Sequence, residues 1–203
     1  MTSPRPRRHF FAALLLPVLI AVCGLSGVRP AAGQNAPRLT DATIRRQIAD
    51  RYAQISAAFR RKDAPGMMAF ATTGFQAKVP GGRTLNRAEA QQNLQQNVDA
   101  LRTIRENRYT LDKLTRRGAT DVICHVTEHF NVVFNDTRGE FGALGKSHTL
   151  TGTTTYRDIW TAPNAQNDGE PAAWQMKRSE MQATQIRLDG RPYRPSRTRP
   201  RRG

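Results

Sequence analysis

The sequence predicts an α+β fold in which N-terminal helices pack on one face of an antiparallel sheet. Two observations carry this prediction. Between residues 40 and 104 apolar residues recur every three or four positions, as they do along one face of an α-helix. From Tyr109 onward they alternate with polar residues, as on strands with one buried face. Helices followed by a run of strands are typical of an α+β domain.

The first two helices have recognisable starts. Thr40 or Asp41 can cap a helix that runs to about residue 62. Asp63 can cap a second, short helix with Pro65 in its first turn. The first helix carries a single apolar stripe at three-to-four spacing, formed by Ile44, Ile48, Tyr52, Ile55 and Phe59.

A third helix is expected from Asn86, where Glu89 completes a capping box. Its expected apolar face consists of Leu94, Val98, Leu101 and Ile104. Strands are expected at about residues 75–79, 108–115, 121–134, 147–161 and 172–187. The strand at 121–134 alternates cleanly and places Val122, Cys124, Val126, Glu128, Phe130, Val132 and Phe134 on one face.

The first 33 residues have the composition of a secretory signal. An arginine-rich opening precedes the uncharged run Phe10–Val28, and Ala31-Ala32-Gly33 offers a cleavage site. We expect a signal peptide at 1–33, a linker at 34–39, one domain at 40–187 and a basic disordered tail at 188–203. The protein would then be secreted or periplasmic. The alternative is a membrane anchor, because about 20 apolar residues can span a bilayer.

The formal net charge of +16 does not by itself predict nucleic-acid binding. Many arginines lie near the two ends, and a basic stripe interleaved with aromatic residues is absent from the sequence. We expect the Arg-Pro-rich tail to be solvated and, if it has a partner, to contact anionic envelope surfaces. Cys124, the only cysteine outside the leader, has no disulfide partner in the chain and is expected to be a small buried side chain.

Two segments near the C-terminal end mix charged and phenolic groups with large apolar ones. Alternate residues on the first are Thr154, Tyr156, Asp158 and Trp160, and on the second Trp174, Met176, Arg178 and Glu180. A polar group on a buried face needs a partner or a cavity, because bare burial costs roughly 1–3 kcal/mol. The pattern therefore predicts a pocket wall.

Two interpretations of the acids stay open. In the first, Asp158 or Glu128 is a general base whose pKa is raised by desolvation, and Tyr52 or Tyr156 donates a hydrogen bond to a substrate carbonyl. In the second, Arg178 forms a structural ion pair with Asp158 or Glu180.

No metal site or cofactor is expected. His125 and His129 are four residues apart on one strand, a separation of about 13 Å that is too long for one zinc ion. A nucleotide-binding loop is likewise absent from the sequence.

The order and spacing of several segments resemble a known family. They are the helix Ile44–Phe59 with its exit Arg61-Lys62-Asp63, then Gly82-Arg83-Thr84, and the closing pair Tyr156-Arg157-Asp158-Ile159-Trp160 and Trp174-Gln175-Met176. Over residues 40–187 this order resembles the nuclear transport factor 2-like superfamily, particularly its SnoaL-like bacterial branch. The resemblance implies a cone-shaped, cystatin-like roll with three N-terminal helices on a curved antiparallel sheet, an internal cavity, and frequent dimerisation through the open sheet face.

The superfamily includes isomerases, cyclases, dehydratases and non-catalytic binding domains, so the fold leaves the function open. We expect an exported, homodimeric domain that binds a small apolar or amphipathic molecule in an apolar cavity, with no established catalysis. The expected ligand-binding residues are Tyr52, Tyr156, Trp160, Trp174, Met176, Arg178 and Glu180. One alternative is a cofactor-independent isomerase, dehydratase or cyclase that uses Asp158, Glu128 and Tyr156. The other is a non-catalytic envelope interaction module.

Overall fold

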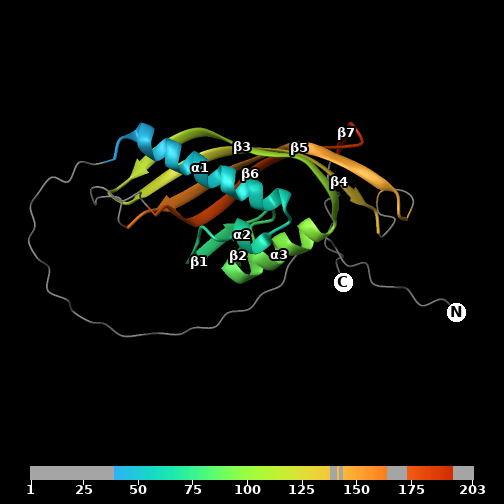
Figure 1. The fold of residues 1–203 in the computed structure, drawn as a ribbon, viewed down its shortest axis with the longest axis horizontal. Coiled ribbons are helices and arrows are strands. Elements are labelled where there is room, and N and C mark those ends of the chain that lie inside the picture. Colours follow the sequence, from blue (N-terminus) through green and yellow to red (C-terminus); the bar gives the residue numbers. More distant parts are fainter. Residues whose placement is uncertain (1–38, 138–140, 142–143, 164–172, 194–203) are drawn as a thin grey trace, which may run out of the picture. The chain divides into compact units, whose positions relative to one another are not determined.

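The computed structural model describes residues 39–137, 141, 144–163 and 173–193 (Figure 1). The elements are α1 (Asp41–Arg60), α2 (Ala64–Met67), β1 (Ala71–Lys78), β2 (Thr84–Asn86), α3 (Arg87–Asp99), β3 (Leu101–Arg117), β4 (Asp121–Asn135), β5 (Ser147–Thr161), β6 (Gln175–Leu188) and β7 (Arg191–Tyr193). The expected signal peptide at 1–33 lies outside the described residues. Of the helices in the described ranges, none is long and apolar enough to span a membrane.

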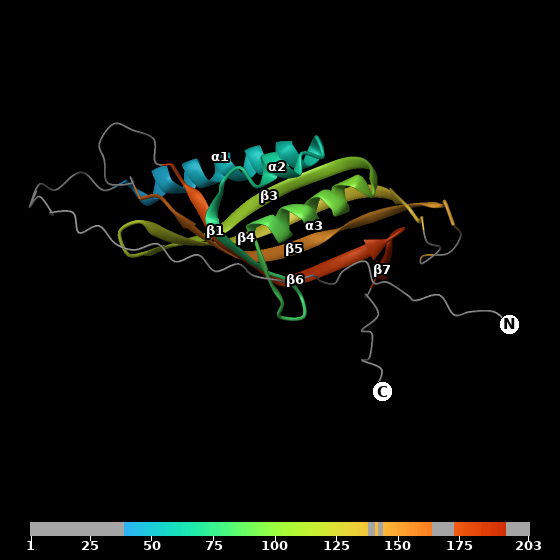
Figure 2. The same cartoon turned by 90° about the horizontal axis from the view of Figure 1, so that it is seen from below.

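One curved, open sheet forms the body of the domain (Figures 1 and 2). Its strand order is β2-β1-β6-β5-β4-β3, and β7 pairs with β6. The four long strands from β3 to β6 form an antiparallel meander, as expected from their alternating sequences. Helix α1 packs along β3, and α3 contacts β1 and β3. The predicted α+β class is therefore confirmed.

The expectation of a wholly antiparallel sheet is wrong at one pair. Strand β1 runs parallel to β6, with Gln76 beside Arg178 and Lys78 beside Glu180. Parallel neighbours need a long crossover connection, and α3 together with the strands β2 to β5 lies between β1 and β6 in the sequence. The short hairpin β1–β2 thus joins the meander at β6, the long strand that comes last in the sequence.

The helix starts follow the predicted caps. Thr40 Oγ1 accepts a hydrogen bond from the amide of Thr43 at 3.1 Å, and Asp63 caps α2. Asn86 and Glu89 form the predicted capping box of α3. The apolar stripe of α1 lies in the main core, in which the buried residues are Ile44, Ile48, Tyr52, Ile55, Ala58, Met67, Val98, Val122, Cys124, Val126, Trp160, Ala162 and Trp174.

The third helix is shorter than the sequence predicted. It ends at Asp99, and Leu101 and Ile104, assigned above to its apolar face, belong to β3. They pair with Phe134 and Val132 of β4. The pairing of a long strand here outweighs the helical spacing of two apolar residues, so β3 starts earlier than the alternation indicated.

The expected disordered tail begins with ordered structure. Strand β6 extends to Leu188, and Asp189 and Gly190, with φ of 49° and 80°, form a turn into β7. Tyr193 then pairs with Ile186. The tail assignment is therefore wrong for residues 188–193, and residues 194–203 lie outside the described part. An Asp-Gly turn between strand residues is a hairpin signal that was present in the sequence.

Helix α1 and the turn that follows it cover the β3 edge of the sheet. Strand β3 is the last strand in the sheet order, so part of its backbone has no strand partner. Side chains of Arg45, Arg60 and Lys62 donate hydrogen bonds to backbone carbonyls of this edge, at Leu111, Asn107 and Leu101 respectively. These contacts satisfy polar groups that would otherwise be open to pairing with another chain.

Candidate functional site

The predicted acids and tyrosines meet between α1 and the concave face of the sheet. Tyr52 projects from α1, Glu128 from β4, and Tyr156 and Asp158 from β5. Asp158 is 3% exposed and Glu128 is 8% exposed. The alternation on β4 and β5 places these side chains on one face, because the registers Cys124–Asp158 and Glu128–Thr154 keep both strands in phase. We call Tyr52, Tyr109, Glu128, Tyr156 and Asp158 the acid–tyrosine cluster.

Asp158 has a strong partner on one oxygen only. The Tyr52 hydroxyl donates to its Oδ2 at 2.6 Å, and Trp160 Nε1 donates to the Tyr52 oxygen at 3.0 Å. The other oxygen, Oδ1, is buried without a hydrogen-bond partner. Ser179 pairs with Asp158 across β5 and β6 and lies close enough to lower the pKa of Asp158. The Ser179 hydroxyl is not placed to donate a hydrogen bond to Oδ1 of Asp158.

Burial raises the pKa of Asp158 to about 6. The hydrogen bond from Tyr52 and the proximity of Ser179 oppose this rise, and the nearby charges of Glu128 and Glu180 add to it. In the part of the chain that the structure describes, no Lys, Arg or His forms an ion pair with Asp158. The carboxyl is therefore a desolvated acid that titrates near neutral pH.

Glu128 is held by three donors. Asn107 Nδ2 and the Tyr109 hydroxyl donate to Oε1 at 2.6 and 3.1 Å, and the Tyr156 hydroxyl donates to Oε2 at 2.8 Å. Burial raises the pKa of Glu128, while these three hydrogen bonds oppose the rise because they stabilise the ionised form. Both carboxylate oxygens are satisfied, which distinguishes Glu128 from Asp158.

The three tyrosines are poised as donors. Burial raises the pKa of Tyr52, Tyr109 and Tyr156 well above the ordinary value, and the neighbouring carboxylates raise it further. They therefore stay protonated and can act only as neutral hydrogen-bond donors near neutral pH. The rings of Tyr52 and Tyr109 stack with centroids 5.3 Å apart, and this contact joins the Asp158 and Glu128 halves of the cluster.

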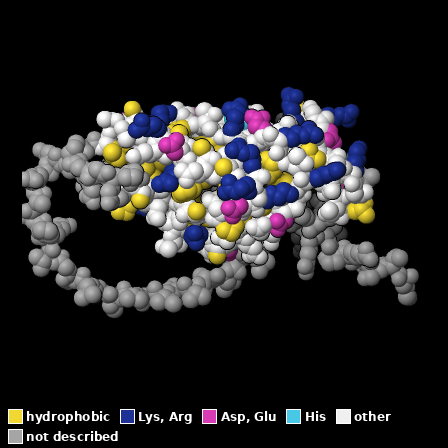
Figure 3. Space-filling view, viewed as in Figure 1, with side chains coloured by type: hydrophobic (Ala, Val, Ile, Leu, Met, Phe, Trp, Pro, Cys, Tyr) yellow, Lys and Arg dark blue, Asp and Glu magenta, His cyan; other side chains and the backbone are white. Residues whose placement is uncertain are grey.

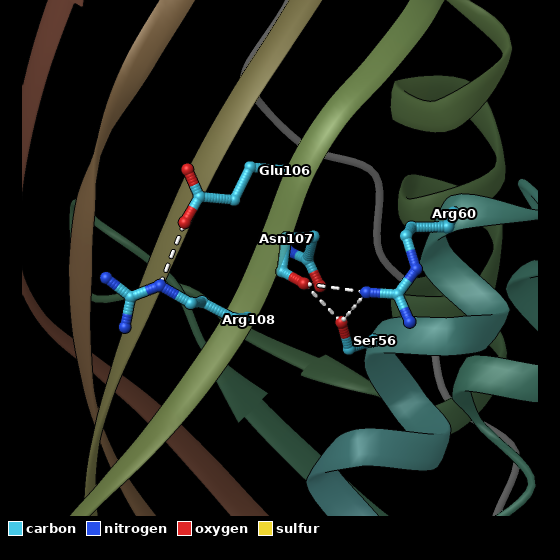
Figure 4. A network of polar contacts seen from close by, with 5 residues as sticks. All are labelled: Ser56, Arg60, Glu106, Asn107 and Arg108. Atoms are coloured by element: carbon cyan, nitrogen blue, oxygen red, sulfur yellow. Dashed lines mark hydrogen bonds and ion pairs between the residues drawn. The ribbon is translucent and has the colours of Figure 1, made fainter.

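Asn107 connects the cluster to α1 (Figure 4). Its side chain donates to Glu128, and its backbone carbonyl accepts hydrogen bonds from Ser56 Oγ and, at 3.1 Å, from Arg60. Glu106 and Arg108 point to the other side of β3, where they form an ion pair at 2.8 Å. The Asn107 Oδ1 atom is buried without a partner, so the interior holds a second unsatisfied acceptor.

Arg178 and Glu180 do not belong to this cluster. An extra residue in β6 between Met176 and Arg178 shifts the register, so Met176 pairs with Trp160 but Arg178 pairs with Ile159. Arg178 and Glu180 consequently lie on the outer sheet face. There Glu180 forms ion pairs with Arg178 at 2.8 Å and with Arg157 at 3.3 Å.

The expected shared face of Trp174, Met176, Arg178 and Glu180 is thus wrong after Met176. The expected structural ion pair exists between Arg178 and Glu180, and Arg178 does not pair with Asp158. Trp174 and Met176 remain in the main core, where Trp174 Nε1 donates to Gln47 at 2.8 Å. An inserted residue reverses the side chains that follow it, here as far as the second register shift between Met181 and Ala183, and the sequence carried no glycine or proline to mark it.

Sequence reasoning missed Tyr109 and Asn107. Tyr109 stood at the start of the alternating region, and its register partner on β4 is Glu128. The alternation of Tyr109 and Leu111 with polar residues was a usable signal for its face. Asn107 lies beyond two register irregularities in β3, and no pattern in the sequence predicts its inward direction.

The buried cluster is not the surface hollow of about 640 Å³ that lies beside α3. The residues that line this hollow are Thr73, Asn86, Arg87, Ala88, Gln91, Gln92 and Gln95, and none of them is a predicted site residue. Within the described ranges, no group of three His, Cys, Asp or Glu side chains could hold a metal ion.

Solved structures share this fold. A protein from Novosphingobium aromaticivorans that bears the provisional name scytalone dehydratase aligns with a TM-score of 0.52 at 13% identity, over 72% of this chain and 88% of its own. The protein Aln2 from a Streptomyces species aligns with a TM-score of 0.51 at 14% identity, over 71% and 93%. A conserved protein from Planctomyces limnophilus aligns with a TM-score of 0.52 at 16% identity, over 68% and 94%.

No family model matches the sequence, and no curated protein matches it. The class of protein is therefore defined by its fold. That fold is the nuclear transport factor 2-like fold, as the resemblance predicted. TM-scores of 0.51–0.52 show a shared architecture, and identities of only 13–16% leave the chemistry to the residues of this chain.

Proposed function

We propose that the domain binds a small, largely apolar molecule that carries a hydrogen-bond donor such as a hydroxyl group. One observation carries the proposal: Oδ1 of Asp158 and Oδ1 of Asn107 are buried acceptors without hydrogen-bond partners. An unpaired buried acceptor costs roughly 1–3 kcal/mol, so a ligand that donates to it gains this amount. The surrounding Trp160, Trp174 and Met176 side chains favour an apolar body for the ligand.

Entry of a ligand requires movement. The carboxyl of Asp158 is covered by Tyr52 and Trp160, so a ligand must displace an aromatic ring or lift part of α1 to reach Oδ1. The binding-competent form is then a minor state of the free protein. The apparent affinity is reduced by the fraction of the free protein that is in the binding-competent state, so we expect moderate affinity.

Tryptophan fluorescence tests this proposal directly. The chain has two tryptophans, Trp160 and Trp174, and both lie in the buried core around the cluster. We would titrate the protein with cyclic alcohols and with their parent hydrocarbons. A saturable change in fluorescence with the alcohols that is weaker with the hydrocarbons supports the proposal. Asp158→Asn should reduce this preference for alcohols over hydrocarbons. Asp50→Asn, on the exposed side of α1, is the matched control. Equal responses to alcohols and hydrocarbons in wild type contradict the assigned role of the acceptors.

A second candidate function is proton transfer without a cofactor. It is favoured by the pKa of about 6 for Asp158, since a general base works best with a pKa near the working pH. Asp158 would take a proton from the carbon next to a carbonyl, while a protonated tyrosine donates to the developing oxyanion. Return of the proton to another carbon gives isomerisation, and its transfer to a leaving hydroxide gives dehydration with release of water.

Hydrogen–deuterium exchange separates catalysis from binding. In D₂O, exchange of the α-hydrogens of simple cyclic ketones would be followed by NMR with wild type, Asp158→Asn and the Asp50→Asn control. Exchange that depends on Asp158 supports the catalytic candidate. Ligand binding without such exchange leaves a binding domain only.

We also propose that the protein is exported and that two copies pair. The leader composition supports export, and the open outer face of the sheet supports pairing of two copies. Mass spectrometry of the protein recovered from producing cells would show whether residues 1–33 are removed. Light scattering after size exclusion would give the number of copies.

A further inference from the structure

The positive charge of the described residues is concentrated along one edge of the domain. We define the basic edge as α1, the turn residues Arg61 and Lys62, and strand β3. It carries twelve basic side chains, at Arg45, Arg46, Arg51, Arg60, Arg61, Lys62, Arg102, Arg105, Arg108, Lys113, Arg116 and Arg117. It carries four acidic ones, at Asp41, Asp50, Glu106 and Asp112. Figure 3 shows the excess of Lys and Arg over Asp and Glu on the face where α1 lies.

Much of this charge is not neutralised within the protein. Asp41 and Glu106 are already paired, with Arg116 and Arg108. Arg46, Arg105, Lys113 and Arg117 are exposed and form no ion pair or side-chain hydrogen bond in the part of the chain that the structure describes. Like charges held along one edge repel one another, so these positions weaken the fold slightly unless a polyanion neutralises them.

The geometry of the edge favours an extended partner. Helix α1 has 20 residues and so spans about 30 Å. Strand β3 has 17 residues and spans about 55 Å. The four unpaired cations are distributed along these elements rather than gathered around one point, which does not fit a single small anion. A line of cations matches a surface or polymer with repeated negative charge.

We infer that the basic edge docks the domain on an anionic lipid surface. The sequence supplies the reason to choose lipid: the apolar leader run ends at Val28, and α1 begins at Asp41. Residues 29–40 connect the two and reach at most about 45 Å, so the edge stays near the membrane in a chain that keeps its leader, as in the membrane-anchored alternative given above. Among the described residues Leu144 is the one exposed large apolar side chain, and it lies outside the edge. The contact is therefore electrostatic, without insertion of apolar side chains into the bilayer.

The same surface argues against single-stranded nucleic acid as the partner. Such binding relies on aromatic rings that stack on bases. Tyr109 is the aromatic residue of β3, and its ring packs against Tyr52 inside the domain. Lipid headgroups need only positive charge, and each Lys or Arg near an anionic leaflet contributes about 1 kcal/mol, which corresponds to about a fivefold change in affinity.

Vesicle partitioning of the full chain tests the inference. We would compare vesicles of pure phosphatidylcholine with vesicles containing about 30% phosphatidylglycerol, and use the ratio of the two partition coefficients. The leader, if present, inserts into both kinds of vesicle, so the ratio isolates the electrostatic contribution. The edge variant is Arg46→Gln, Arg105→Gln, Lys113→Gln and Arg117→Gln. The matched control, with the same loss of charge elsewhere, is Lys78→Gln, Lys146→Gln, Arg187→Gln and Arg191→Gln.

At low salt the ratio of the two partition coefficients should fall at least about 25-fold in the edge variant. This is the value expected if two of the four residues contact the lipid, at about fivefold each. The control should lose much less, and salt at about 0.5 M should abolish the difference because it shortens the screening length to a few Å. Three outcomes overturn the inference. They are no preference of wild type for phosphatidylglycerol, equal losses in the edge variant and the control, and edge-dependent binding to duplex DNA that is tighter than binding to the anionic vesicles.

Discussion

Replacement of Asp158 by Asn should change how the stability of the protein depends on pH. Asp158 has a pKa of about 6 in the folded protein, whereas an unperturbed aspartate titrates at about 3.9. The folded state therefore binds this proton more tightly than the unfolded state. The protonated carboxyl contributes stability that is fully present below about pH 3.9 and is lost as the pH rises through about 6.

The size of the effect follows from the two pKa values. The pKa of Asp158 in the folded state exceeds that in the unfolded state by about two pH units. Each pH unit corresponds to about 1.36 kcal/mol, so the total is roughly 3 kcal/mol. The group is 3% exposed, so solvent screens it little. The amide that replaces the carboxyl in Asp158→Asn is neutral at every pH. The free energy of unfolding of the variant, relative to that of wild type, should therefore increase by roughly 2.5 kcal/mol between about pH 4 and about pH 7.5, because part of the difference is already present at pH 4.

Urea unfolding followed by tryptophan fluorescence would measure this. Trp160 lies beside Tyr52 and reports on the same layer. Any constant cost of placing an amide against the unpartnered position of Oδ1 cancels when the two pH values are compared. Asp50→Asn, on the exposed side of α1, is the control for the substitution of an aspartate by asparagine. Parallel stability profiles of wild type and Asp158→Asn would refute the reasoning, because they would mean that Asp158 titrates alike in both states.

Three further changes test neighbouring contacts. Tyr52→Phe removes the hydrogen-bond donor to Asp158, so a carboxyl-resolved NMR titration should show a further rise in the pKa of Asp158. The variant should also lose roughly 1–3 kcal/mol in stability. An unchanged pKa would contradict the hydrogen bond. Glu128→Gln removes a nearby negative charge, so the same titration should show a lower pKa for Asp158, and a higher one would contradict the coupling. Gly152→Ala places a Cβ against the backbone oxygen of Gln185 on β6 and should lower the stability measured by thermal unfolding by roughly 3 kcal/mol. In the control Gly74→Ala the new Cβ meets nothing within 4 Å, so stability should change by less than about 0.5 kcal/mol. Equal losses in the two variants would contradict the close packing at Gly152.

Most of the fold was predictable because each element is marked locally. The stripe of α1, the caps at Thr40, Asp63 and Asn86, and the alternation of β4 are patterns within a few residues of the chain. The errors arose where distant strands decide the structure. Leu101 fits a helix by spacing, and only its pairing with a residue of β4 makes it a strand residue. The parallel pairing of β1 with β6 likewise depends on a partner that is far away in the sequence.

The candidate site was predictable to the same extent. The face that carries Tyr156 and Asp158 follows from strict alternation on β5, and the pairing of β5 with β4 is regular throughout. Alternation failed on β6 because the strand contains extra residues, and Arg178 moved to the outer face. Hydrogen-bond partners were beyond reach, because they depend on register across three strands rather than on the sequence of one.

The assembly of the site and the closure of the sheet edge depend on the same helix. Tyr52 and Ser56 are one turn apart on α1, so they lie on the same face of the helix. Tyr52 contacts Asp158 in the middle of the sheet, while Ser56 contacts the carbonyl of Asn107 on the edge strand. The Asn107 side chain in turn holds Glu128. A motion that lifts α1 to admit a ligand must therefore release the Tyr52 contact to Asp158 and uncover carbonyls of β3 together. Ligand entry and exposure of the edge are two consequences of one opening, so amide exchange along β3 should accelerate under the same conditions that expose Asp158.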